Sequence, residues 1–237
     1  MKILNLYACL GGNRYKWDEV ANIQVTAVEL DPELARMYKQ RFPKDTVIIA
    51  DAHKYLIEHY QEFDFIWSSP PCPTHSRVRI SQKNKDFFVA QYPNMKLYEE
   101  IIFLKHNFKG KYVVENVIPY YQPLIFAQKR GRHLYWSNFR IPTNISDRIS
   151  EKGLIGGRAT NQLKKLCEFH EIDLSSYKGN QLKQTIARNL VDFQAGKTIF
   201  ETAMGIIKKT NAKQIAFSFS FTFILLLNYT VIIYCCM

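Results

Sequence analysis

Strand-like apolar runs alternate with helical patterns through the first half of this chain of 237 residues. The helical patterns lie at 32–42, 52–59 and 94–108. Strands that alternate with helices build parallel sheets, because each helix carries the chain back to the same edge. We therefore predict an α/β fold built on a parallel sheet with crossover helices. The expected strands are 3–7, 24–29, 46–50, 63–68 and 111–115, followed by two more at 125–128 and 133–139.

Positive charge is concentrated in the second half of the chain. The net charge is +11, of which residues 1–110 carry +2 and residues 111–213 carry +9. A basic half beside a near-neutral half suits a polyanionic partner such as nucleic acid. The apolar fraction of 47% indicates a folded core rather than disorder. Beyond residue 140 the pattern weakens to three expected helices, at 160–170, 181–190 and 194–208.

The five cysteines show no spacing typical of a metal site or a disulfide framework. They stand at positions 9, 72, 167, 235 and 236, and no Cys-x-x-Cys pair occurs. We predict no bound metal. The first residues run straight into a strand without a signal peptide, which predicts a bacterial or phage-infected host cytoplasm. In that reducing compartment a free cysteine can act as a nucleophile.

The end of the chain is an uncharged stretch, 215–237, that follows three lysines. Its length would suffice for a membrane-spanning helix. Its alternating Phe and Ser residues and its β-branched residues fit a helix less well. We expect a read-through extension or a segment packed on the body rather than a membrane anchor.

Three successive strand ends carry residues that suit an adenosine. Gly11 and Gly12 follow the first strand, Glu29 ends the second and Asp51 follows the third. A glycine turn lets the backbone approach a ligand, and an acidic residue at the second strand end can accept hydrogen bonds from ribose hydroxyls. Taken singly, these residues would be a tight turn, a solvated strand end and a helix N-cap. Together they predict a cofactor site, and the spacing leaves a dinucleotide and S-adenosylmethionine both open.

A thiol, a carboxylic acid and a guanidinium follow in order along the chain. Cys72 ends Ser-Ser-Pro-Pro-Cys, Glu115 ends the fifth strand, and Arg132 lies on the next β element. A thiolate that adds to C6 of cytosine makes C5 nucleophilic toward a methyl donor. Glu115 can present a proton to N3, Arg132 can hold O2 and a nearby phosphate, and Asn116 can orient the Cys72 loop. Separately, these residues would be a buried cysteine, a surface carboxylate and a phosphate contact.

These motifs resemble the ordered motifs of DNA (cytosine-5) methyltransferases, and the stretch around Cys72 resembles small phage or prophage members. The resemblance covers residues 1–140 well and continues weakly to about 205. It implies a Rossmann-like fold that uses S-adenosylmethionine and acts, as a monomer, on a cytosine flipped out of double-stranded DNA, as in restriction–modification. It makes Cys72 the nucleophile and Glu115 the acid at N3 or N4. The other implied site residues are Arg130, Arg132 and Asn116 near the base, and Tyr7, Gly11, Gly12, Glu29, Asp51 and Asn189 at the cofactor.

The resemblance also implies a division of the chain. We expect a catalytic and cofactor-binding domain at 1–139, a small basic target-recognition region at 140–187, a return segment of the catalytic domain at 188–213 and the hydrophobic tail at 214–237. The loop 74–86, which carries several basic residues, is predicted to close over DNA.

Three departures from the family pattern leave other interpretations open. Cys9 stands where the family loop has glycine, Pro73 follows Pro-Cys, and the last motif around Asn189 is degraded. One alternative is a non-catalytic DNA-binding remnant. A second is an amino-methyltransferase acting on N4 or N6, which Ser69-Pro70-Pro71 fits in part, and a third is a tRNA cytosine methyltransferase.

Overall fold

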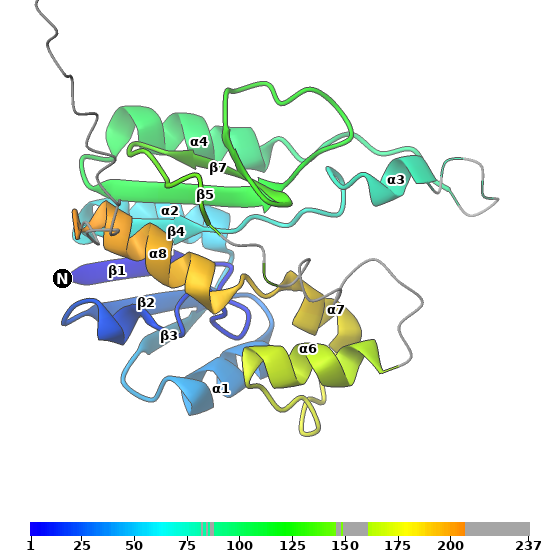
Figure 1. Ribbon diagram of the computed structural model, residues 1–237, viewed down its shortest axis with the longest axis horizontal. Coiled ribbons are helices and arrows are strands. Elements are labelled where there is room, and N and C mark those ends of the chain that lie inside the picture. Colours follow the sequence, from blue (N-terminus) through cyan, green and yellow to red (C-terminus); the bar gives the residue numbers. More distant parts are fainter. Residues whose placement is uncertain (82, 84, 86–87, 146–147, 149–160, 207–237) are drawn as a thin grey trace, which may run out of the picture. The chain divides into compact units, whose positions relative to one another are not determined.

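A seven-stranded sheet forms the centre of the molecule. The computed structural model describes residues 1–81, 83, 85, 88–145, 148 and 161–206 (Figure 1). The strand order is β3-β2-β1-β4-β5-β7-β6, in which β1 to β5 are parallel and β7 runs antiparallel to both β5 and β6. The predicted α/β fold with a parallel sheet is confirmed. The strands are β1 Lys2–Leu6, β2 Gln24–Glu29, β3 Thr46–Ile49, β4 Phe65–Ser68, β5 Lys111–Val117, β6 Gln128–Arg130 and β7 His133–Ser137.

The described helices connect or follow these strands. They are α1 Pro32–Arg41, α2 Ala52–His59, α3 Val78–Ser81, α4 Lys96–Asn107, α6 Gln162–His170, α7 Lys183–Asn189 and α8 Phe193–Ala203, with single 3₁₀ turns at Trp17–Glu19 and Tyr60–Glu62. Asp31 caps α1 by accepting from the amides of Glu33 and Leu34, and Pro32 occupies the first turn, where its missing N–H costs nothing.

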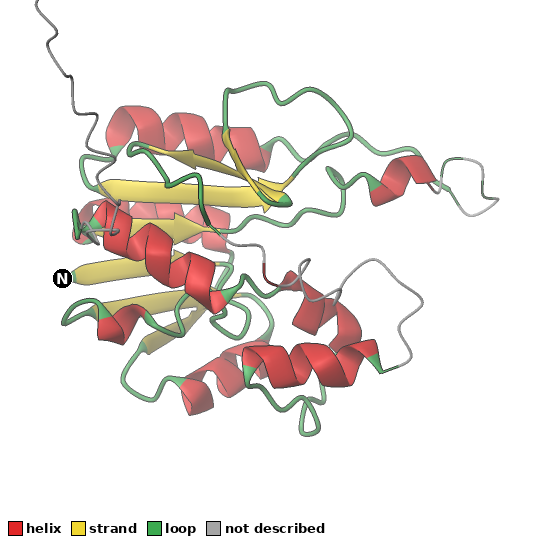
Figure 2. Cartoon of the chain, viewed as in Figure 1, coloured by secondary structure: helices red, strands yellow, loops and turns green. Residues whose placement is uncertain are grey.

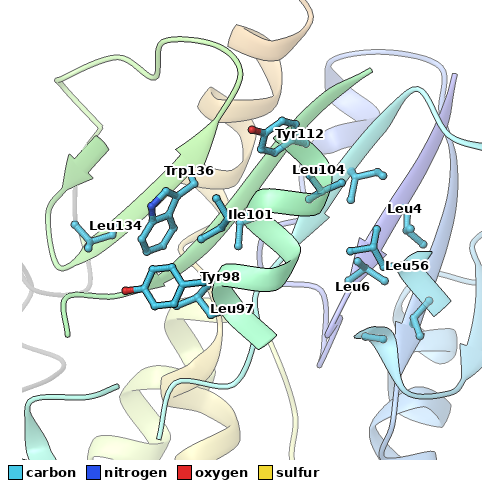
Figure 3. Packing of buried hydrophobic residues seen from close by; sticks show 14 residues of the cluster. Leu4, Leu6, Leu56, Leu97, Tyr98, Ile101, Leu104, Tyr112, Leu134 and Trp136 are labelled. Atoms are coloured by element: carbon cyan, nitrogen blue, oxygen red, sulfur yellow. The ribbon is translucent and has the colours of Figure 1, made fainter. Parts of the chain in front are cut away.

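Both faces of the sheet are covered by helices (Figure 2). Because successive side chains of a strand point to opposite faces, Leu4 packs on one face with α2 and α4, while Ile3 packs on the other with α8. On the first face, Leu97 and Ile101 of α4 lie against the strands together with Trp136 of β7 (Figure 3). This burial is the main stabilising contribution, about 1.5–3 kcal/mol for each large apolar side chain.

The helices α6 and α7 pack against α1. Leu166 and Ile186 share a buried cluster with Leu34 and with Leu10 of the glycine loop. The described part of the predicted recognition region therefore packs against α1 and the glycine loop, which belong to the predicted domain at 1–139. Its proposed reading of DNA remains a prediction, and residues 146–147 and 149–160 lie outside the described part.

Several element boundaries differ from those predicted. The strand expected at 125–128 is instead β6, and a turn with Gly131 at φ +52° joins it to β7. The last predicted helix ends at Ala203, and Gly205 follows at φ +69°, which terminates a helix readily. The loop 74–86 contains the short helix α3.

The hydrophobic tail falls outside the described residues, so its predicted role is not tested. None of the helices in the described part of the chain is long and apolar enough to cross a bilayer.

Candidate active site

The glycine loop after β1 is held in a strained conformation by Glu29. Tyr7, Cys9 and Gly11 all have positive φ, at +56°, +47° and +67°. The Glu29 carboxylate accepts from the Cys9 amide at 2.8 Å and from the Asp31 amide at 2.9 Å. Burial, opposed in part by these amides, raises the pKa of Glu29. Glu29 therefore joins the first two loops at the carboxyl edge of the sheet, which is where ligands bind in such folds.

Close packing places the chain after α7 directly against this loop. A Cβ atom on Gly12 would lie 2.6 Å from the Val191 carbonyl oxygen, and one on Gly196 would lie 2.3 Å from that of Asn13. The structure thus packs the chain around Val191 and Gly196 on the glycine loop. Asn189, its predicted cofactor contact, is the exposed last residue of α7.

A buried ion pair fixes the far end of the loop. Arg14 donates from Nε and Nη2 to the two oxygens of Asp45, at 2.8 and 2.9 Å, and both residues are at most 3% exposed. The Tyr38 hydroxyl donates to the same carboxylate at 2.9 Å. This bidentate geometry sets the direction in which the chain leaves the loop.

Asp51 and a buried carboxylate on α4 lie near the third strand end. Asp51 caps α2, with Oδ1 accepting from the amides of His53 and Lys54. Burial opposes ionisation of Asp51, but the Lys54 amide, Lys96 and the His53 amide outweigh it and lower its pKa. Glu100, with a fully buried side chain, accepts from the hydroxyls of Tyr7 and Ser68, each at 2.6 Å, and lies 3.0 Å from His53 Nδ1. Glu100 thus connects the ends of β1 and β4 to the start of α2.

The loop that carries Cys72 is anchored to the neighbouring strand. Parallel pairing of β4 with β5 sets Ser68 beside Val114, so the Cys72 loop begins next to Glu115. Asn116 Nδ2 donates to the Pro70 carbonyl oxygen at 2.9 Å, which is the orienting contact that the sequence predicts. Cys72 is half-buried and Glu115 is buried. The structure therefore brings Cys72, Glu115 and Asn116 together.

The two arginines of the predicted site are placed differently. The Arg130 guanidinium donates to the carbonyl oxygens of Ile141, Pro142 and Lys129, so it ties β6 to the segment after β7. These contacts are those of a positioning residue, and a role for Arg130 at the base remains a proposal. Arg132 lies in the β6–β7 connection, where its carbonyl oxygen accepts from the Ile118 amide at 3.4 Å.

Sequence reasoning missed three polar residues at this edge. His133 Nε2 lies 3.4 Å from Glu115 Oε1, and Glu100 joins the strand ends described above. His75 is 1% exposed, and its Nδ1 lies 2.5 Å from the Tyr121 hydroxyl. The signal that could have found His133 is its place directly after Arg132 in the sequence, and the pairing of β7 with β5 then sets it beside Val117. Nothing in the local sequence of α4 marks Glu100. In the described residues, no group of three or more His, Cys, Asp or Glu could hold a metal ion.

We expect the Cys72 thiol to react slowly with iodoacetamide near neutral pH. Burial, and then the Glu115 charge, raise the pKa of Cys72, so the reactive thiolate is scarce below that pKa. Glu115→Gln removes the neighbouring negative charge, lowers the pKa and should accelerate alkylation at about pH 8. Peptide-resolved mass spectrometry separates Cys72 from the other cysteines. Glu99→Gln, on the exposed side of α4, is the control and should leave the rate unchanged; equal rates for both variants would contradict the electrostatic contact.

We expect Cys9→Gly to be more stable than Cys9→Ala by about 1 kcal/mol. Both variants remove the thiol, whose pKa burial and Glu29 raise to about 12, but only glycine relieves the left-handed backbone at φ +47°. Urea denaturation midpoints of the two variants give the difference. Equal midpoints would show that the loop carries no strain at Cys9.

The fold is the Rossmann-like architecture of methyltransferases. The chain shares its fold with the Entamoeba histolytica methyltransferase EhMeth, at 11% identity and a TM-score of 0.50, over 88% of this chain and 99% of that one. Weaker likenesses include a Spodoptera frugiperda DNMT2 mutant, at 22% identity and a TM-score of 0.36 over 49% of this chain. A putative DNA modification methyltransferase of an Escherichia coli prophage is 18% identical, with a TM-score of 0.35 over 52% of this chain.

Residues 1–118 match the family of C-5 cytosine-specific DNA methylases. The predicted family resemblance is thereby confirmed over these residues. This chain covers 35% of the DNMT2 chain and 33% of the prophage enzyme. No curated protein matches the chain.

Proposed function

We propose that the protein methylates C5 of a cytosine flipped out of duplex DNA, through a covalent bond between Cys72 and C6. The observation that carries this proposal is the parallel pairing of β4 with β5, which starts the Cys72 loop beside Glu115. Asn116 holds this loop. A thiol in the loop after β4 and a carboxyl group near the end of the adjacent β5 are the pair that this reaction needs.

The chain's own residues have separate tasks in the reaction. Cys72 loses its proton and bonds to C6, while Glu115 gives a proton to N3, so that the ring accepts the electron pair without a full negative charge. His133, 3.4 Å from Glu115, is placed to share that proton. After C5 has gained its methyl group, N3 returns its proton to Glu115. Loss of the C5 proton to a base then forms the C5=C6 double bond as the C6–S bond breaks and the Cys72 thiolate leaves.

The strand ends suit S-adenosylmethionine. Both Glu29 oxygens accept backbone N–H groups, and a carboxylate oxygen can accept more than one hydrogen bond, so Glu29 can also receive a ribose hydroxyl. Gly11 serves the packing of the loop, because a Cβ atom there would lie 2.5 Å from the Phe42 ring. Asp51 Oδ2, 3.6 Å from Lys96 Nζ, is free of the capping bonds and can accept from an adenine amino group. Bound there, S-adenosylmethionine would supply an electrophilic methyl group.

A second candidate is a DNA-binding remnant that has lost catalysis. Cys9 favours it, because a side chain now stands in the left-handed turn where the family has glycine. An amino-methyltransferase is less well supported, since Cys72 stands where such enzymes place an aromatic residue and Glu115 would have no task.

Transfer of labelled methyl from S-adenosylmethionine to unmethylated duplex DNA tests the proposal. Digestion and mass spectrometry of the product should find the label as 5-methylcytosine. Label on N4 or N6 would overturn the thiolate mechanism. Binding of DNA without transfer, and without stabilisation by S-adenosylmethionine, would identify the remnant.

A further inference from the structure

Two loops at the carboxyl edge are joined to each other beyond Cys72. Ser76 and Pro119 form an isolated β-bridge, and the Tyr120 amide donates to the His75 carbonyl oxygen at 3.0 Å. The buried His75 ring lies 2.5 Å from the Tyr121 hydroxyl. These contacts hold the segment after β4 against the segment after β5.

Tyr121 is also anchored to the core. Its hydroxyl lies 3.3 Å from that of Tyr98, a buried residue of α4, and Tyr98 in turn accepts from the Leu124 amide at 3.3 Å. The segment that carries Tyr121 is therefore held on α4, one of the helices that cover the sheet. Its position does not depend on a bound ligand.

An open groove of about 620 Å³ lies between these loops, and its volume is in the range of small-ligand sites. Cys72 and Glu115 do not line it, so it is separate from the proposed reaction site. Its chemistry combines a guanidinium, phenol rings, an amide and an aliphatic side chain. The lining residues are Arg77, Ile80, Pro119, Tyr120, Tyr121 and Gln122.

We propose that this groove binds a nucleotide that flanks the target cytosine in the DNA strand. The inference rests on the proposed function. Arg77 is exposed, with Nε donating to the Pro119 carbonyl oxygen at 3.4 Å, and its charge can attract a phosphate. Tyr120 and Tyr121, whose rings pack edge to face with centroids 5.1 Å apart, give the groove an aromatic surface for stacking with a base. Exposed Lys83 lies on the same loop and adds to its positive charge.

The groove is also within reach of the strand at the reaction site. Arg77 is five positions after Cys72 in the chain, and such a segment spans at most about 18 Å. The amides of His75 and Ser76 both donate to the Cys72 carbonyl oxygen, which shortens the path further. A nucleotide in the groove would therefore hold the segment that carries the nucleophile.

Anisotropy titrations with a short fluorescein-labelled, cytosine-containing duplex test this proposal on the full chain. Arg77→Gln should weaken binding about five- to tenfold and lower the slope of log affinity against log salt by about one. Tyr120→Leu should weaken binding about fivefold or more, with the salt slope unchanged, because stacking releases no ions. Arg36→Gln removes an equal charge from the exposed face of α1 and should leave the affinity within twofold.

The outcomes separate this inference from the proposed function. If the protein methylates duplex DNA and both groove variants bind as tightly as the unmodified chain, only this inference is overturned. If the unmodified chain binds no duplex, both are overturned. If it binds without methylating and the groove variants weaken binding, the groove is supported and the methyl transfer is not. Circular dichroism of each variant confirms that the fold is intact.

Discussion

Cys72→Ser should abolish methyl transfer, with a loss of at least about 10³-fold, the scale on which covalent enzymes lose activity with their nucleophile. A serine hydroxyl at this place cannot ionise where even the thiol has a raised pKa from burial and Glu115. The Asn116 contact to the Pro70 carbonyl oxygen does not involve the side chain of residue 72, so the loop should keep its position. Methyl incorporation into unmethylated duplex DNA measures the loss.

The matched control is Cys167→Ser. Cys167 is also half-buried and has a thiol pKa raised by burial, but it lies on α6, away from the Cys72 loop. The control should keep full activity, and the Cys72 variant should keep its affinity for duplex DNA. Transfer by Cys72→Ser at a rate near that of the control would rule out the covalent adduct.

Arg14→Met should destabilise the protein by about 3–5 kcal/mol, the usual effect of removing one partner of a buried ion pair. Methionine leaves the Asp45 carboxylate, 3% exposed, without the bidentate partner that Arg14 supplies at 2.8 and 2.9 Å. The free energy of unfolding from urea denaturation measures the effect. The glycine loop should loosen as well, since Arg14 follows it directly in the chain.

Two variants show whether the buried charge is the cause. Arg36→Met removes an exposed arginine paired with Glu33 and should leave the urea midpoint nearly unchanged, because water screens such pairs. Adding Asp45→Asn to Arg14→Met should recover part of the lost stability, because no uncompensated charge then remains. A single Arg14→Met variant as stable as Arg36→Met would contradict the burial of this pair.

The sequence by itself determined the fold class and the order in which the candidate site residues follow the strands along the chain. Alternation of strands and helices is local, so it predicts the parallel strands β1 to β5. The same pattern predicts Glu29 at the end of β2 and Cys72 in the loop after β4, whereas Glu115, expected to end the fifth strand, is followed by two more residues of β5. The strand at 125–128 and the end of the last helix were wrong by several residues. There the outcome depends on pairing with β7 and on the left-handed Gly205, which are weakly marked in the local pattern.

Only the tertiary structure decided which side chains meet. Glu100 lies on α4, far in the chain from Tyr7 and His53, and the three come together because α4 and α2 cover the same face of the sheet. The Arg130 guanidinium, whose predicted place near the base remains a prediction, donates to the Ile141 and Pro142 carbonyl oxygens, contacts that no local pattern indicates. Periodicity reports which face of an element is apolar, whereas a contact between distant residues depends on how the elements pack, and the local sequence does not contain that information.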